Sequence, residues 1–390
     1  MNRLIVVGAG PAGLSLALQL ARAGQPVTLL EAQTAFSRSF RGDALMPCGL
    51  EALARMGLLG LLQDLPQRPL ADWQVWLEGR RLFAVAEPLG ALQPCTLVPQ
   101  QLLLEAMLAE AGSLPGFTWQ AGVAVSGLVF AGQRVAGVRL ADGRTLTADL
   151  VIACDGRDSP LRQAAGLELV PRGQPLELLW FQLPECHADL QGFLTLVGGG
   201  AIASACRTAG DALQLGWLLR HGEATPQRTP QAWAERLAAL APPELAALLR
   251  ARGEALSRPR RFRVQVGLAP QWQRPGLLLL GDAAHPMSPI RAQGINMALR
   301  DSLVAARELL TGAAGQADLD QACRRIQTLR RPEIQRVQSL QLAEAQQGHW
   351  IGHTPLLRHG LALAAPLLGP LAQAVWTARQ KPLREGVAWL

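Results

Sequence analysis

The N-terminal stretch holds the pattern that most constrains the fold: a short strand, a glycine-rich loop, a helix and a second strand follow one another. Residues 3–7 are apolar after Arg3 and lead into the loop GAGPAG at 8–13. A helix rich in leucine and alanine comes next, and a second strand, 27–30, ends at Glu31. This order predicts a parallel βαβ unit in which the loop and the helix N-terminus bind the pyrophosphate of a dinucleotide.

Each glycine of the loop has a predicted task. Gly8 permits the tight turn, Gly10 lets the backbone approach the pyrophosphate, and Gly13 lets the helix pack closely on the strand. Glu31 lies about twenty residues further on, where a carboxylate accepts hydrogen bonds from a ribose 2′-hydroxyl. An acid there favours an adenosine ribose without a 2′-phosphate, hence FAD or NAD. The glycines at 198–200 open no helix and are typical of a hairpin turn, so we expect one dinucleotide site.

Two later buried strands also end in an acidic residue. The strand at 277–280 leads to Asp282, and a loop then connects it to a helix that opens at 294–296. Asp282 is placed to accept hydrogen bonds from a polyol chain, and the helix N-terminus offers free N–H groups to a developing anion. The strand at 148–153 ends in Asp155-Gly156, which by itself is a common strand exit.

In this order the three segments resemble the flavoprotein aromatic hydroxylases, the single-component FAD monooxygenases of the p-hydroxybenzoate hydroxylase class. The loop with Glu31 is similar to the family's FAD fingerprint, CDGRDS at 154–159 to its DG motif, and GDAAHPMSPIRAQGIN at 281–296 to its GD motif. The resemblance covers residues 3 to about 345. It implies FAD as the cofactor and NADH or NADPH as a transient electron donor. It also implies O2 chemistry through a flavin C4a-hydroperoxide that hydroxylates a small aromatic or conjugated substrate.

Two other functions stay open at this point. One is a flavin-dependent reductase of the geranylgeranyl reductase type. The family's reductases and halogenases usually lack a histidine after GDAA, which this chain has as His285, and no WxWxIP run is present. The other alternative is a non-catalytic protein that binds flavin or another ligand.

The resemblance also implies, position by position, which residues meet the cofactor. Those expected to contact FAD or the passing nicotinamide are Gly8, Gly10, Gly13, Glu31, Arg41, Gln100, Asp155, Gly156, Asp282, Pro289, Gly294, Ile295 and Asn296. For Asp282 the alternative is a turn residue, and for Asn296 a helix cap. The chain departs from the type member at Ile290-Arg291, where that protein has a Thr-Gly pair.

The chain contains no tyrosine, so the tyrosine-linked proton relay of the type member cannot exist here. Either the substrate needs no deprotonation, or another titratable group removes the proton. His285 is the only histidine inside a cofactor motif, and its ordinary pKa of about 6.5 suits a general base. The alternative is a structural histidine, hydrogen-bonded beneath the flavin loop.

The expected fold class is α/β: a doubly wound, Rossmann-like FAD-binding domain with a β-rich substrate lobe and C-terminal helices. We expect the FAD-binding domain to comprise 1–71, 95–170 and 263–340, the substrate lobe 72–94 and 171–262, and the segment 341–390 to form helices packed outside the FAD-binding domain. Trp180, Arg207 and Trp217 lie on lobe strands predicted to face the flavin. Arg207 would pair with a carboxylate or phenolate of the substrate, unless it is a surface arginine.

Composition excludes several other classes. The net charge is +7, but the arginines are scattered rather than clustered among aromatic residues, which argues against nucleic-acid binding. The six cysteines are widely spaced without a CxxC pair, so neither a disulfide scaffold nor a zinc site is expected. His349 and His353 lack a third ligand, so we predict no metal. With an N-terminus too short for a signal peptide, these features favour the cytoplasm.

One apolar segment near the C-terminus bears on membranes. Residues 360–378 carry no charge, nearly the length of a membrane span, but Pro366, Gly369 and Pro370 interrupt them. Two short helices that cover the core are therefore expected, with contact to a membrane surface as the lesser alternative. The sequence gives no indication of the oligomeric state.

Overall fold

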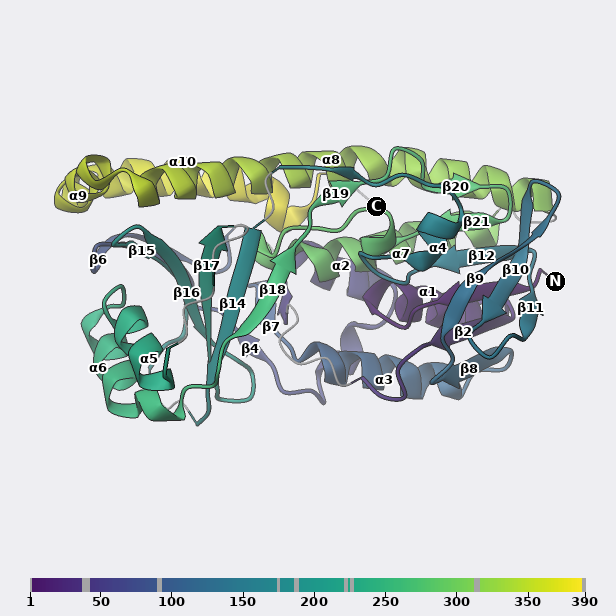
Figure 1. Ribbon diagram of the computed structural model, residues 1–390, viewed down its shortest axis with the longest axis horizontal. Helices are drawn as coiled ribbons and strands as arrows, with labels where there is room; N and C mark the ends of the chain where they lie inside the picture. The colour runs from purple at the N-terminus through teal and green to yellow at the C-terminus, as the bar shows by residue number, and fades with distance from the viewer. Residues whose placement is uncertain are drawn as a thin grey trace.

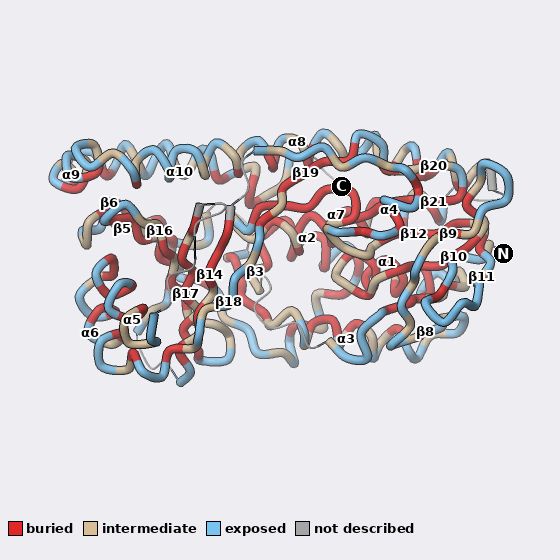
Figure 2. Tube along the Cα trace, in the orientation of Figure 1, coloured by how far each residue is buried: buried red, intermediate tan, exposed pale blue. Residues whose placement is uncertain are grey.

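The computed structural model describes residues 2–36, 43–89, 93–173, 176–185, 189–220, 224, 228–311 and 316–387. Figure 1 shows an elongated molecule with a largely parallel sheet at one end and a mixed, mostly antiparallel sheet at the other. The long helix α8, Gln316–His353, extends from one large sheet to the other and contacts both. Figure 2 shows the buried residues gathered within and beneath the sheets, whereas the outer face of α8 is exposed.

The parallel sheet contains six strands in the order β20-β21-β12-β1-β2-β8. Its strands are β1 (Leu4–Val7), β2 (Val27–Glu31), β8 (Phe117–Ala121), β12 (Leu150–Ala153), β21 (Leu277–Leu279) and the antiparallel edge strand β20 (Gln273–Arg274). The three central strands β1, β12 and β21 are buried at every residue, as a parallel sheet covered on both faces requires. Their carboxyl ends therefore bring the three predicted motifs to one edge of the sheet.

The two faces of this sheet are covered differently. Helices α1 (Pro11–Arg22), α3 (Gln100–Gly112) and α7 (Gln293–Thr311) pack together over one face. A three-stranded antiparallel sheet of β9 (Val125–Ala131), β10 (Arg134–Leu140) and β11 (Thr145–Thr147) packs over the other. The cores on both faces consist mainly of leucine, valine, isoleucine and alanine side chains.

The second large sheet has seven strands in the order β18-β14-β17-β16-β15-β5-β6. Its strands are β5 (Asp72–Leu77), β6 (Arg80–Ala86), β14 (Leu176–Leu183), β15 (Phe193–Gly198), β16 (Ala201–Arg207), β17 (Leu213–Arg220) and β18 (Arg260–Val264). One face packs against α5 (Pro230–Ala238) and α6 (Pro243–Arg252) around Trp233, which is almost fully buried. The other face looks toward the parallel sheet.

The remaining elements are short connections between the two large sheets. They are β3 (Ala44–Leu45), α2 (Pro47–Arg55), β4 (Arg68–Pro69), β7 (Thr96–Leu97), α4 (Pro160–Ala164), β13 (Val170–Pro171) and β19 (Gly267–Leu268), with 3-10 turns at Leu59–Leu62, Gly253–Ala255, Gly281–Ala283 and Ile290–Ala292. Among the described helices, proline occupies the first turn of seven: α1, α2, α4, α5, α6, α9 (Pro355–Leu363) and α10 (Ala365–Glu385). Its fixed φ suits a helix start, and its missing N–H would have no partner there.

The C-terminal segment forms helices α9 (Pro355–Leu363) and α10 (Ala365–Glu385), and their predicted place outside the FAD-binding domain stays a prediction. They lie over the β5–β6 edge of the seven-stranded sheet, where Trp376 contacts the rings of Trp73 and Phe83. The predicted fold class is confirmed, with a parallel sheet, a β-rich lobe and C-terminal helices. The division into two domains stays a prediction, and β18 crosses its boundary at residues 262 and 263.

Candidate active site

A cavity of about 1580 Å³ lies between the two large sheets. It begins at Gly10 beside the parallel sheet, runs along the seven-stranded sheet at Trp180, and ends at Val375 on α10. A pocket for one small molecule has a volume of about 300–1,000 Å³. This cavity therefore has room for a dinucleotide cofactor and a second molecule.

The glycine loop has the shape that a pyrophosphate site requires. A Cβ on Gly8 would lie 2.4 Å from the Cys154 carbonyl oxygen, and one on Gly13 would lie 1.9 Å from the Gly8 carbonyl oxygen. Both positions therefore require glycine, because a Cβ at either one would collide with a neighbouring backbone carbonyl. A Cβ on Gly10 would have no neighbour within 4 Å, and Gly10 lines the cavity. The open space in front of Gly10, at the N-terminus of α1, fits the pyrophosphate of FAD.

Glu31 lies at the end of β2, where the sequence placed a ribose-binding carboxylate. Its two carboxylate oxygens accept hydrogen bonds from the Ala9 amide at 2.8 Å and the Gln33 amide at 3.0 Å. The side chain is buried but still lines the cavity. Its orientation is therefore fixed by the loop itself, with an edge toward the predicted adenosine end.

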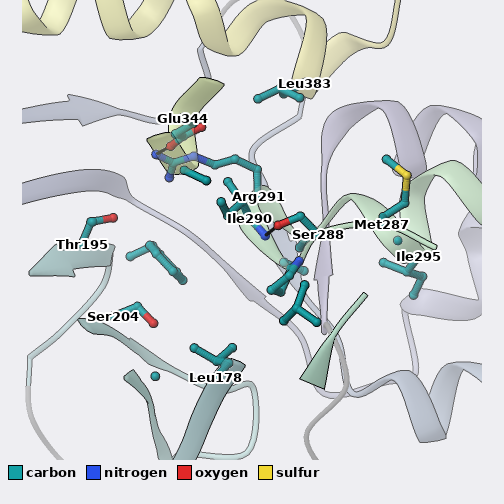
Figure 3. A pocket seen from close by; sticks show the side chains of 18 of the residues that line it. Leu178, Thr195, Ser204, Met287, Ser288, Ile290, Arg291, Ile295, Glu344 and Leu383 are labelled. Carbon is teal, nitrogen blue, oxygen red and sulfur yellow. Dashed lines mark hydrogen bonds and ion pairs between the residues drawn. The ribbon is translucent and has the colours of Figure 1, made fainter. Parts of the chain in front are cut away.

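Four of the five predicted contacts in the GD motif line the opposite part of the cofactor region. Pro289, Gly294 and Ile295 all border the cavity at the start of α7. Asp282 also lines it and lies 3.7 Å from Arg157, both side chains being about one-third exposed. Figure 3 shows Ile295 beside Met287 on this side of the cavity. A polyol and a flavin edge could meet these groups.

Asn296 has a different position. Its side chain is fully buried and does not line the cavity among the described residues. Its Oδ1 accepts a hydrogen bond from the Met46 amide at 2.9 Å, and its Nδ2 donates to the carbonyls of Ala44 and Ala292. The side chain therefore ties β3 to the start of α7, and only its backbone could face a cofactor.

Asp155 also acts on the protein backbone. It accepts hydrogen bonds from the Ser159 hydroxyl at 2.6 Å and the Leu161 amide at 3.0 Å, so it holds the first turn of α4. Gly156 follows with a φ of +88°, a region that favours glycine, and this residue does line the cavity. Arg41, the remaining predicted contact of this region, lies outside the described residues.

His285 lies away from the cavity. It is 1% exposed, its Nε2 is 2.6 Å from Asp301 Oδ2, and its ring lies against Trp272. Arg330 binds the other Asp301 oxygen at 2.7 Å. Burial alone would raise the pKa of Asp301, but His285 and Arg330 outweigh it and hold that pKa below its usual value. This geometry favours the structural alternative for His285.

The seven-stranded sheet, which we call the substrate sheet, presents one continuous row of residues to the cavity. Trp180 pairs with Gly216, Gly216 with Ser204, Ser204 with Thr195, and Thr195 with Val75, so the row crosses five strands. All five residues line the cavity, and Figure 3 shows Ser204 and Thr195 on neighbouring strands. A Cβ on Gly216 would lie 3.1 Å from the Trp180 ring and 2.6 Å from the Ser204 hydroxyl. Glycine at 216 thus makes space for both side chains.

Trp217 and Arg207 lie on the same strands but not in the cavity lining. Trp217 is paired with Leu179, the residue before Trp180. Its ring packs on Trp233 on the other face of the sheet, with ring centroids 5.7 Å apart. Since side chains alternate between faces, Trp180 and Trp217 must point in opposite directions. Arg207 forms an ion pair with Asp211 at 2.6 Å outside the cavity.

Arg291, which departs from the family pattern, turns away from the cofactor region. Its guanidinium lies between the rings of Trp73 and Trp376, 5.0 and 4.8 Å from their centroids, and forms an ion pair with Glu344. Figure 3 shows the side chain extended toward Glu344. The backbone has a φ of 56°, where glycine would be expected. The cation–π contacts and the ion pair stabilise a conformation that is costly for arginine.

Asp43 is the cavity residue that no sequence argument assigned. It lines the cavity next to Ala44 and Leu97, and its carboxylate accepts a 3.3 Å hydrogen bond from the Gln100 amide. Burial raises the pKa of Asp43 to about 6, against the lowering effect of that hydrogen bond. The Cys206 thiol of the substrate sheet is close enough for Asp43 to raise its pKa further, after burial. Asp43 therefore lies between the cofactor region, with Gln100, and the substrate sheet.

The chain matches the model of one protein family, described as FAD binding domain, over residues 2–337. It is 35% identical over 357 residues to 6-methylpretetramide 4-monooxygenase of Streptomyces rimosus, covering 87% of this chain and 83% of that protein. It is 30% identical to 3-amino-4-hydroxybenzoate 2-monooxygenase of Streptomyces platensis, covering 86% of this chain and 85% of the relative.

Solved structures agree on the fold. The Pseudomonas aeruginosa protein PqsL, in complex with 2-aminobenzoylacetate, superposes with a TM-score of 0.76 at 23% identity, covering 93% of this chain and 98% of that chain. The p-nitrophenol 4-monooxygenase of Pseudomonas putida superposes with a TM-score of 0.78 at 20% identity, over the full length of both chains.

Proposed function

We propose a substrate class, an electron donor and a general base for this chain, which belongs to the FAD binding domain family. It is an FAD-dependent monooxygenase, because the relatives that it matches over most of their length are monooxygenases. The reductase and the non-catalytic alternatives are not supported by these relatives.

We propose that the substrate is a neutral, extended aromatic molecule. The observation that carries this proposal is the lining of the seven-stranded sheet, which holds no charged side chain among its described cavity residues. It offers aromatic rings, above all Trp180, and the hydroxyls of Ser204 and Thr195 further along the same row. Against this sheet a carboxylate would lose its hydration without gaining a charged partner on any of the seven strands, whereas a flat apolar molecule would stack on the tryptophan.

The cofactor region supports a role for FAD in which the protein supplies position and electrostatics. Gly10 and Glu31 would hold the ADP half, Asp282 the ribityl chain, and the amides at Gly294 and Ile295 the flavin edge. When bound, FAD accepts electrons from the donor and passes them to O2. The free N–H groups at the start of α7 favour negative charge on the flavin. NADH or NADPH is the proposed donor, as is typical of the family.

We propose Asp43, rather than His285, as the general base. A carboxylate with a pKa of about 6 is mostly ionised at pH 7 and still basic enough to take a proton from a phenol during attack. Its hydrogen bond with the Gln100 amide and its charge effect on the Cys206 thiol support a position between the cofactor region and the substrate sheet. In a chain without tyrosine, it can replace the missing phenolic relay.

The test measures oxidation of NADH or NADPH, oxygen uptake and product mass with the purified FAD-loaded chain. The panel contains neutral phenols of one to four fused rings and matched aromatic carboxylates. We expect the larger neutral phenols to gain one oxygen atom and to stimulate both oxygen uptake and nucleotide oxidation. Preferential turnover of carboxylates would contradict the proposed substrate class, and turnover in the absence of oxygen would contradict the reaction.

A further inference from the structure

The C-terminal segment has an unusual combination of charge and exposed apolar surface. Residues 345–384 contain no aspartate or glutamate. Leucine side chains nevertheless face outward on α9 and α10: Leu356 is 89% exposed, Leu367 84% and Leu363 67%. Exposed apolar clusters of this kind mark contact surfaces. We call the exposed residues Trp350, Leu356, Leu363, Leu367, Leu368, Leu371 and Val375 the leucine face.

The leucine face is not the result of loosely placed helices, because the opposite sides of α9 and α10 are firmly attached. Arg358 of α9 is buried and forms an ion pair with Glu78. Arg384, near the end of α10, forms a double ion pair with buried Glu87. A Cβ on Gly369 would lie 2.5 Å from the Leu82 carbonyl oxygen, so α10 lies directly on β6. These contacts fix both helices in place, so the leucine face stays exposed to solvent.

The charges around the leucine face are positive. Arg80 and Arg81 of β6 are exposed and line a shallow groove together with Pro366 and Pro370 of α10. Lys381 is exposed further along α10. Among the described residues, no carboxylate lies within ion-pair distance of these three cations. The apolar face is thus bordered by cations that are free to meet an anionic surface.

The same face is continuous with the candidate active site. Trp350, Leu368, Leu371 and Val375 are exposed to solvent, yet they also line the cavity. Figure 1 places α9 and α10 at the end of the molecule away from the N-terminus, above the substrate sheet. An apolar molecule could pass from an apolar phase at the leucine face into the cavity without crossing water.

We propose that the leucine face docks on an anionic lipid bilayer surface, with α9 and α10 lying in the interface. No single helix in the described ranges is long and apolar enough to cross a membrane, and α9 and α10 pass that test only as a pair bent by 102°. A bent, amphipathic pair with flanking cations suits the headgroup region, where lysine and arginine reach anionic phosphates. A second copy of the chain would bring the same cations against each other, which disfavours self-association through this face.

The experiment is cosedimentation of the FAD-loaded protein with vesicles of phosphatidylcholine, alone or with phosphatidylglycerol. The test variant is Leu356→Glu/Leu367→Glu, whose side chains are exposed and do not line the cavity. The matched control is Leu310→Glu/Leu329→Glu, two exposed leucines outside the leucine face. FAD content and melting temperature, which neither variant should change, verify that both fold.

We expect the wild type and the control to bind phosphatidylglycerol vesicles, less at high salt, and the test variant to bind at least about tenfold more weakly. Equal binding of the test variant, or no binding of the wild type to either vesicle, would overturn the proposal. Size-exclusion chromatography of the same proteins separates the other occupant. A wild-type dimer that the test variant converts to a monomer, without vesicle binding, would assign the leucine face to a second copy instead.

Discussion

The two ends of the cavity are built on different principles. At the cofactor end, contacts are made by backbone atoms and by side chains fixed to backbone atoms: Gly10 leaves space, and Glu31 is held by two amides. At the substrate end, the lining consists of side chains on adjacent strands, such as Trp180 and Ser204. The cofactor end recognises a molecule through the position of its backbone atoms. The substrate end recognises one through the identity of the side chains that face the cavity.

From this difference we expect substitutions at the two ends to have different effects. A change at the cofactor end that adds atoms to the backbone path should abolish FAD binding without affecting the substrate sheet. A change on the sheet should alter substrate use while leaving FAD in place. Residues between the two ends, such as Asp43, should leave both bindings intact and alter the reaction.

The largest expected effect is loss of the cofactor in Gly10→Val. Gly10 has an ordinary φ of −71°, and a Cβ there meets no protein atom within 4 Å, so the chain should fold normally. The added side chain would occupy the proposed pyrophosphate site, and we expect FAD affinity to fall by about 100-fold or more. Absorbance of the purified protein at flavin wavelengths measures the bound FAD.

The matched control for this variant is Gly127→Val on β9, which is equally free of neighbours and lies in a strand, where valine is favoured. It should retain full FAD. If Gly10→Val binds FAD as tightly as this control does, the loop is not the pyrophosphate site.

Much of the cofactor end could be predicted from the sequence because its signals are local. The turn at Gly8, the close packing at Gly13 and the acid at the end of β2 are all specified within one βαβ unit. Side-chain partners were harder to predict. Asn296 was taken as a cofactor contact, but its partners Ala44 and Met46 lie about 250 residues away in the sequence, and no local pattern reveals them.

The strands of the substrate sheet were also predicted, but not which of their residues face the cavity. That depends on pairing between distant strands. Trp180 and Trp217 both occur on strands of the lobe, and only the register that pairs Trp180 with Gly216 shows that they point to opposite faces. Asp43 was missed because its significance depends on burial against Cys206, which is 163 positions away.

The next effect in size is on the reaction itself. Asp43→Asn keeps an oxygen that can accept the hydrogen bond from the Gln100 amide, so α3 and FAD should stay in place. Loss of a general base should lower the rate of hydroxylation by about 100- to 10,000-fold. The wild-type rate should rise with pH as the Asp43 carboxyl loses its proton near its pKa of about 6, and the variant should lack this rise. Rates of product formation from pH 5 to 8 measure both effects.

Asp43→Glu is the conservative control and should recover part of the rate together with the pH dependence. If Asp43→Asn hydroxylates as well as the wild type does, the carboxylate only holds α3. The position would then be structural.

A smaller effect separates the two faces of the substrate sheet. Trp180→Leu should raise the KM for aromatic substrates about tenfold, because a stacking surface is lost, with little change in stability. Trp217→Ala should instead lower the free energy of unfolding by about 3–5 kcal/mol, since it opens a cavity against buried Trp233. Steady-state kinetics and chemical denaturation of both variants measure the contrast. If Trp217→Ala raised the KM without loss of stability, the substrate would lie on the face of the sheet that carries Trp217 and not on the face that carries Trp180.

The smallest expected effect is that of Arg207→Ala, and it tests the proposed neutral substrate most directly. Arg207 pairs with Asp211, whose side chain is 60% exposed and also binds Arg68, and neither Arg207 nor Asp211 lines the cavity. Pairs with an exposed partner contribute about 0–1 kcal/mol, so loss of this ion pair should change stability by no more than that. KM values for neutral phenols and for aromatic carboxylates should each change less than about twofold, because no charge is removed from the cavity lining. A selective rise in KM for carboxylates alone would show that Arg207 reaches the substrate. The uncharged sheet would then have to reorganise when substrate binds, and the proposed substrate class would be wrong.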